Sequence, residues 1–133
     1  MYQYYLFNID NEVIDFFKHN NSYLFSTLNT IYKSDFKNIN NNYLVLNDLV
    51  NEIPKVNLNL LLFNSFKNDD YYLKFKNKHI INDYFSKEHS ELFLNNLYIK
   101  VSSSYEYPTF FKELKKTGNW FICDFKNINY FWL

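Results

Sequence analysis

Three histidines and one cysteine are the side chains in this sequence that are best suited to metal binding or catalysis. His19, His79 and His89 stand far apart, without the close His or Cys pairs that anchor zinc. Cys123 has no second cysteine to pair with and lies in an apolar run, where a buried thiol is unreactive. We therefore predict neither a metal site nor a bound cofactor.

Other residues with catalytic side chains are better explained without catalysis. Residues 88–91 bring a histidine and two glutamates together in sequence, but neighbours on a chain point in different directions, and a solvated loop explains them. The serines at 102–104 precede an expected helix, so capping explains them better than a nucleophile without a positioned base. Gly118 is the only glycine, which excludes the usual phosphate-binding loop. We expect a protein that is not an enzyme.

A short helix with surplus apolar side chains indicates protein binding instead. Residues 12–18 follow a candidate N-cap at position 10 or 11. Ile14 and Phe17 share one helical face, while Val13, Phe16 and Phe17 share another, so burial of one set leaves part of the other exposed. Exposed aromatic side chains are typical anchors of protein interfaces. The spacing equally allows both phenylalanines to fold inward.

Aromatic and lysine residues along Tyr71–Lys76 indicate an alternative function from another class. Rings mixed with lysines could form a platform on which single-stranded nucleic acid stacks its bases. A half-buried strand explains the same alternation, and the balanced charge of the chain favours that explanation.

The composition favours a single domain, 1–133, with an aromatic core. The 15 Phe and 13 Tyr supply rings that pack edge to face. The 14 basic residues, all lysine, balance 14 acidic ones, so the basic field and the arginines typical of DNA-binding proteins are missing. Acidic residues interrupt the N-terminal apolar segment, and the apolar run at 60–63 is too short to cross a bilayer. We expect a soluble cytoplasmic monomer that binds neither DNA nor a membrane directly.

The stretch Ser104–Phe125 gives the clearest prediction of secondary structure. Four apolar residues recur there at helical spacing: Tyr107, Phe110, Phe111 and Leu114. The predicted helix has Pro108 in its first turn and Gly118 as a left-handed C-terminal cap. The unbroken apolar run at 120–123 then predicts a central strand that is covered on both faces.

The remaining elements are predicted from periodicity and turn residues. Before residue 70 they are a strand over 2–9, the helix over 12–18, a helix capped by Ser22, a polar loop over 35–42, a short strand entering a helix over 42–52, and a helix over 58–66. After it they are strands over 71–76, 92–94 and 97–101, a tight turn at Asn95-Asn96, and a strand or aromatic tail over 130–133. Residues 78–90 are ambiguous. This mixture predicts an α+β fold with a mainly antiparallel sheet covered by several helices.

Residues at both ends of the chain carry a family resemblance. They are Tyr4-Tyr5-Leu6 with the short helix after it, the Ile53-Pro54 step, the segment Phe110–Lys116, Phe121, Asp124-Phe125 and the closing Trp132-Leu133. In these residues the chain resembles the sporulation inhibitor of replication family, SirA.

The resemblance implies a non-enzymatic inhibitor that binds the N-terminal domain of the bacterial replication initiator DnaA. In the family, two aromatic positions one turn apart on the first helix contact this partner, and here they fall on Val13 and Phe17. A third contact, polar in the family, falls near Val45. We expect Val13 and Phe17 to form an exposed apolar anchor, with Phe16 and Asn20 beside it.

Overall fold

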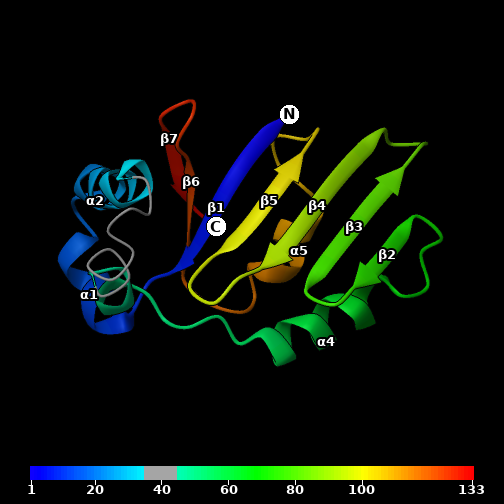
Figure 1. Cartoon of the computed structure of the whole chain (residues 1–133), viewed down its shortest axis with the longest axis horizontal. Helices are drawn as coiled ribbons and strands as arrows, with labels where there is room; N and C mark the ends of the chain where they lie inside the picture. Colours follow the sequence, from blue (N-terminus) through cyan, green and yellow to red (C-terminus); the bar gives the residue numbers. More distant parts are fainter. Residues whose placement is uncertain (35–44) are drawn as a thin grey trace.

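A seven-stranded sheet in the order β2-β3-β4-β5-β1-β6-β7 forms the centre of the molecule (Figure 1). The computed structural model describes residues 1–34 and 45–133. The strands are β1 (Tyr2–Asn8), β2 (Tyr72–Phe75), β3 (Lys78–Asp83), β4 (Glu88–Leu94), β5 (Ile99–Ser103), β6 (Trp120–Asp124) and β7 (Asn129–Trp132). Every neighbouring pair is antiparallel. The predicted α+β fold with an antiparallel sheet is confirmed.

Helices cover parts of both sheet faces. They are α1 (Asn11–Phe17), α2 (Asn21–Lys33), α4 (Lys55–Phe66) and α5 (Phe110–Leu114). Residues 45–49 are also helical, so the strand expected at the start of the 42–52 segment is wrong for its described part. The polar loop expected over 35–42 lies outside the described residues.

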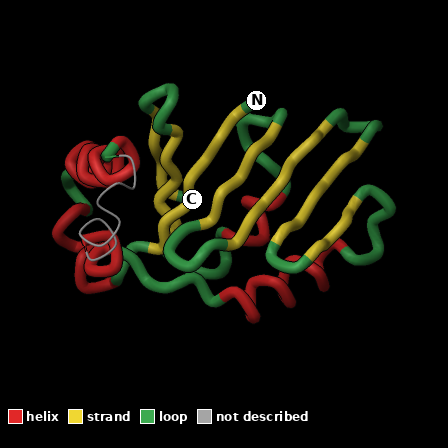
Figure 2. The backbone as a smooth tube through the Cα atoms, in the orientation of Figure 1, coloured by secondary structure: helices red, strands yellow, loops and turns green. Residues whose placement is uncertain are grey.

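The alternation of β1 divides the apolar side chains between two cores. Tyr4 and Leu6 point into a cluster under α4 and α5, whereas Phe7 joins a second cluster with α1 and α2. Figure 1 shows α1 and α2 grouped at the end of the sheet that carries β6 and β7. In Figure 2 none of the described helices lies in front of β2, β3, β4 and β5, so this part of one sheet face has no cover from them.

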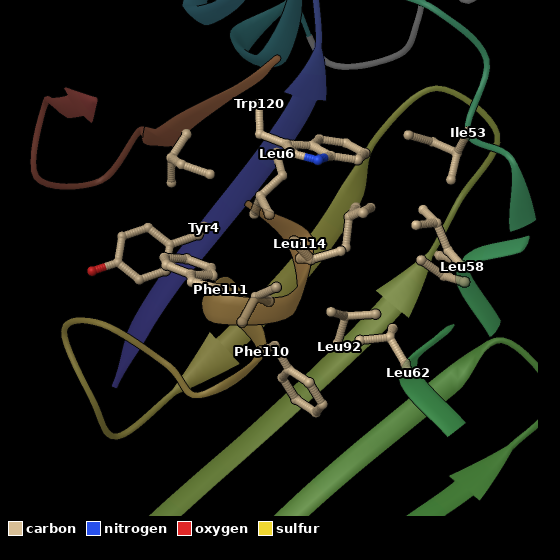
Figure 3. Packing of buried hydrophobic residues seen from close by; sticks show 14 of the residues in the cluster. Tyr4, Leu6, Ile53, Leu58, Leu62, Leu92, Phe110, Phe111, Leu114 and Trp120 are labelled. Carbon is tan, nitrogen blue, oxygen red and sulfur yellow. The ribbon is translucent and has the colours of Figure 1, made fainter. Parts of the chain in front are cut away.

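The first cluster holds α4 and α5 against the sheet. Figure 3 shows Leu58 and Leu62 of α4 and Phe110 and Leu114 of α5 gathered around Leu92 of β4. The rings of Phe66 and Phe110 meet edge to face, with centroids 5.6 Å apart. These contacts confirm the helix predicted over 58–66 and the predicted apolar stripe at Phe110, Phe111 and Leu114. Tyr107, also expected in the stripe, lies before α5 and is exposed.

The helix α5 is shorter than the sequence predicted. Pro108 precedes the N-cap, Thr109, instead of lying in the first turn, and Lys115 is the C-cap. The serines at 102–104 do not cap this helix, because Ser103 ends β5 and the hydroxyl of Ser104 accepts the backbone N–H of His89. A buried carboxylate holds the start of α5 instead, as described below.

Gly118 does not form the predicted left-handed cap. No glycine has a positive φ angle, and α5 has already ended at Leu114. Close approach explains the glycine, because an added Cβ would lie 2.9 Å from the Asn8 Oδ1 atom. That oxygen accepts the backbone N–H of Asn119, which leads directly into β6.

The strand β6 is buried along its whole length, as predicted for a central strand. It lies between β1 and β7, and all five of its residues are buried. Residues 129–132 form β7, which confirms the strand of the two alternatives predicted for residues 130–133.

The ambiguous segment 78–90 contains β3 and the start of β4. Apolar alternation did not identify these strands, because polar residues occupy some of their buried positions: His79, Glu88 and Ser90. Glu88 therefore lies in a strand and not in a solvated loop. The Asn95-Asn96 turn is wider than predicted, since Leu94 pairs with Ile99 across a four-residue connection.

Glu88 links β4 to the start of α5. Its Oε2 atom accepts the Ser90 hydroxyl at 2.5 Å and the Thr109 backbone N–H at 3.1 Å. The Thr109 hydroxyl donates to Oε1. This side chain therefore satisfies three donors in a buried position.

His79 is the centre of a second buried network, between α4 and the sheet. The Tyr72 hydroxyl and His79 Nδ1 are 2.6 Å apart, and His79 Nε2 lies 2.7 Å from Asn59 Oδ1. A neutral ring satisfies both contacts if Nε2 carries the proton and donates to Asn59. Burial and the positive charge of Lys74 lower the pKa of His79 to about 4.

We predict that His79 makes the protein less stable as pH falls from about 6.5 toward 4. The unfolded chain binds a proton at the ordinary pKa of 6.5, whereas the folded chain binds it only near 4. Stability from the neutral ring is therefore complete above pH 6.5 and decreases below it, by on the order of 3 kcal/mol. Urea unfolding across this range should show a steeper loss for the parent than for His79→Gln. His89→Gln, at a half-exposed position, is the control. The same pH dependence in His79→Gln as in the parent would contradict the assignment.

We also predict that Glu88→Gln lowers the free energy of unfolding by about 1–3 kcal/mol. The amide group replaces one accepting oxygen with a donor, which leaves a buried donor of Thr109 or Ser90 without an acceptor. Glu91→Gln, at a half-exposed position on the same strand, is the matched control and should change stability by less than about 1 kcal/mol. Equal stability of the two variants would rule out the role given to Glu88.

Candidate protein-binding site

The helix α1 is held where β1 leaves the sheet. Asp10 is its N-cap, and the Asp10 Oδ1 atom accepts the Glu12 backbone N–H at 2.9 Å. Ile9 pairs with Val50 in an isolated bridge, and the Asp10 N–H donates to the carbonyl of Leu49. The segment 45–50 therefore fixes the junction from which α1 projects.

The structure places the two phenylalanines of α1 in opposite environments. Phe17 is 3% exposed and belongs to the second core, so the expectation that its side chain is exposed is wrong. Phe16 is 73% exposed. The chain buries the face on which Phe17 meets α2 and the sheet, and Phe16, the next residue around the helix, must then point to solvent.

Phe16 rests on a support of aromatic rings. Its ring meets that of Phe17 edge to face, with centroids 5.0 Å apart and an interplanar angle of 89°. Phe17 in turn stacks on Tyr23 of α2 at 5.8 Å. Tyr23 is itself exposed, so two aromatic side chains from two helices lie at the surface around a buried third. Sequence periodicity did not identify Tyr23 as a surface residue.

Val13 and Asn20 flank this arrangement. Val13 is half-buried and packs against the second core. Asn20 is exposed, and its Oδ1 atom accepts the Tyr23 backbone N–H at 3.3 Å. Asn20 is thus the N-cap of α2, and the prediction that Ser22 caps this helix is wrong. The cap also fixes Tyr23 relative to the end of α1.

Val45, also a predicted site residue, is distant in sequence from α1 and the residues that flank it. It is the first described residue of a helical segment that ends at Leu49, and it is exposed, while Leu46 and Val50 are buried. Since Leu49 accepts the Asp10 N–H, this segment lies beside the N-terminus of α1. Figure 1 shows the two at the same end of the molecule.

A hollow opens on another side of α1. It is lined by Ile14, Asp15, Lys18, Asn21 and Trp132, and its volume is about 320 Å³. The Trp132 indole N–H donates to Asn21 Oδ1 at 3.1 Å, which joins β7 to the start of α2. One acidic and one basic side chain thus border the apolar surface, as in the polar rim of a protein interface.

The described part of the chain bears on the predictions made for the histidines and for Cys123. Within 1–34 and 45–133, no group of three or more His, Cys, Asp or Glu side chains is placed to hold a metal ion. Cys123 is buried, and burial raises the pKa of its thiol. Of the helices in these residues, none has the length and apolar character that a bilayer crossing requires. The surface around α1 is suited to noncovalent contact.

Comparison with known proteins assigns the chain to a family. The model of the family described as "Sporulation inhibitor of replication protein SirA" matches residues 2–133. The chain belongs to the SirA family. Membership places it among sporulation-associated inhibitors of replication, which agrees with the resemblance seen at the two ends of the sequence. A search of the curated proteins finds no match.

The SirA match spans β1, α1 and the segment 45–50 as well as the C-terminal strands. The segment Tyr71–Lys76 is divided between the two faces of the sheet, and the Lys76 Nζ atom lies 5.5 Å from the centre of the Phe75 ring. Leu73 and Phe75 point to the uncovered face of the sheet, whereas Tyr72 and Lys74 point toward α4.

The stabilities of Phe16→Ala and Phe17→Ala should show which of the two phenylalanines is buried. We expect Phe17→Ala to lower the free energy of unfolding by about 3–5 kcal/mol, because it leaves a cavity in the second core. Phe16→Ala should cost less than about 1 kcal/mol. Urea unfolding of both variants gives the two values, and similar losses for both would contradict the burial pattern.

Proposed function

We propose that this chain inhibits chromosome replication by binding the N-terminal domain of the initiator DnaA through the surface around α1. This surface consists of Phe16, Val13, Asn20, Tyr23 and Val45. The observation that supports the proposal most strongly is the exposed Phe16 ring, which rests on Phe17 and Tyr23.

An exposed phenylalanine on a rigid support can bind at low entropic cost. Phe16 has few rotatable bonds, and its edge-to-face contact with the buried Phe17 restricts it further. A pocket on the partner that encloses the ring would bury most of its apolar surface, as hot-spot residues do. Phe17 contributes to binding indirectly in this proposal, because it fixes the position of Phe16.

Inhibition follows from occupation of a partner surface and requires no chemistry on the partner. DnaA bound at α1 would be unable to use the covered surface for its own assembly or for helper proteins. Val45 and Asn20 would contact the rim of the interface, where substitutions have smaller effects.

Phe16→Ala should weaken binding to the DnaA N-terminal domain of the same organism by at least about 2 kcal/mol, which is roughly thirtyfold in Kd. Calorimetric titration measures this directly. Phe85→Ala removes a fully exposed ring from the β3–β4 turn and is the matched control, with an unchanged Kd expected.

Two outcomes distinguish the site from the function. If the parent binds and Phe16→Ala binds equally well, α1 is not the contact surface. If the parent shows no binding, DnaA is not the partner of this chain.

A further inference from the structure

The edge strand β2 has exposed apolar side chains on one face, and exposed apolar side chains of α4 lie beside its other face. It lies at the opposite end of the sheet from α1 and β7 (Figure 1). Edge strands of soluble proteins are usually protected by charge, proline, bulges or a covering element, because their free backbone groups pair with other chains. Here the protection is partial, and three features converge on the same strand.

The first feature is the free backbone of Lys74. The Asn82 N–H donates to the carbonyl of Tyr71, so in an antiparallel pair the backbone groups of Leu73 and Phe75 also point toward β3. Those of Tyr72 and Lys74 then point away from the sheet. The Tyr72 N–H donates to the Asp69 carbonyl, so Lys74 is the residue of β2 whose N–H and carbonyl can both pair with an added strand.

The second feature is an apolar groove between α4 and this edge. Val56, Leu60 and Phe63 follow one another at helical spacing and are exposed on α4. Together with Asn59 and Lys74 they line a hollow of about 410 Å³. The apolar stripe of α4 therefore faces the space beside β2, with the Lys74 side chain at its border.

The third feature is the uncovered side of β2. Leu73 is 68% exposed and Phe75 is 69% exposed, and Phe93 of β4 is also exposed on this face. A strand added beside β2 would place alternate side chains next to Leu73 and Phe75 on one face and in the α4 groove on the other.

Charge indicates the chemistry of the added strand. Among the described residues, Lys74 and Lys76 form no ion pair, whereas Lys78 is paired with Glu91 at 3.4 Å. A second copy paired through β2 would bring Lys74 close to its own equivalent, and like charges on adjacent strands repel. Acidic side chains on the added strand would instead meet both unpaired lysines.

We propose that β2 binds an extended segment of a partner protein as an eighth strand, and that this segment has apolar residues on both of its faces and an acidic residue on the face toward α4. Its apolar side chains occupy the α4 groove and cover Phe75, and a carboxylate pairs with Lys74. This surface is separate from the one around α1 and does not depend on DnaA binding.

A display library of random twelve-residue peptides, selected on the immobilised full chain, tests this proposal. The enriched peptides should have apolar residues at adjacent positions, which supply both faces of a strand, together with at least one Asp or Glu. A synthetic copy of the most enriched peptide should bind Lys74→Glu and Leu60→Gln at least tenfold more weakly than the parent. Both substitutions lie at exposed positions, so melting temperatures should stay close to that of the parent. Phe16→Ala is the control and should bind the peptide with unchanged affinity.

Four results would overturn the proposal. They are the absence of enrichment, enriched peptides with helical spacing or without acidic residues, equal binding to Lys74→Glu and the parent, and a dimer in sedimentation equilibrium that Leu60→Gln abolishes. The last result would mean that a second copy occupies the edge.

Discussion

The pairing of β1 with β5 and β6 is the constraint on which the rest of the structure depends. Leu6 pairs with Ile99 on one side and Ile122 on the other, so the first segment of the chain joins the two parts of the sheet. Its side chains are buried on both faces, and this requires cover on both. The helices α4 and α5 supply it on one face, and α1 and α2 supply it on the other.

This constraint also positions the binding surface. A seven-residue helix such as α1 is not stable by itself, because nucleation costs more than so few hydrogen bonds return. It is fixed by β1 before it, by the bridge between Ile9 and Val50, and by Phe17 in the second core. Burial of Phe17 is therefore the condition for the exposure of Phe16, since adjacent helical residues differ by about 100°.

Much of the fold was predictable because its signals are local. Apolar spacing predicted α4 and the stripe on α5, and the unbroken run at 120–123 predicted the buried β6. The failures have tertiary causes. The carboxylate of Glu88, distant in sequence, determines where α5 begins, and the proximity of Asn8 explains Gly118. For the site, periodicity identified α1 but left open which phenylalanine is buried, because that depends on the direction from which α2 and the sheet approach.

The most direct test of the central claim is hydrogen–deuterium exchange of the chain alone and with the DnaA N-terminal domain. The account predicts slower exchange on complex formation in α1, the start of α2 and residues 45–50, with β2 and α4 unchanged. Protection confined to β2 and α4, or unchanged exchange around α1 in a complex that forms, would contradict it.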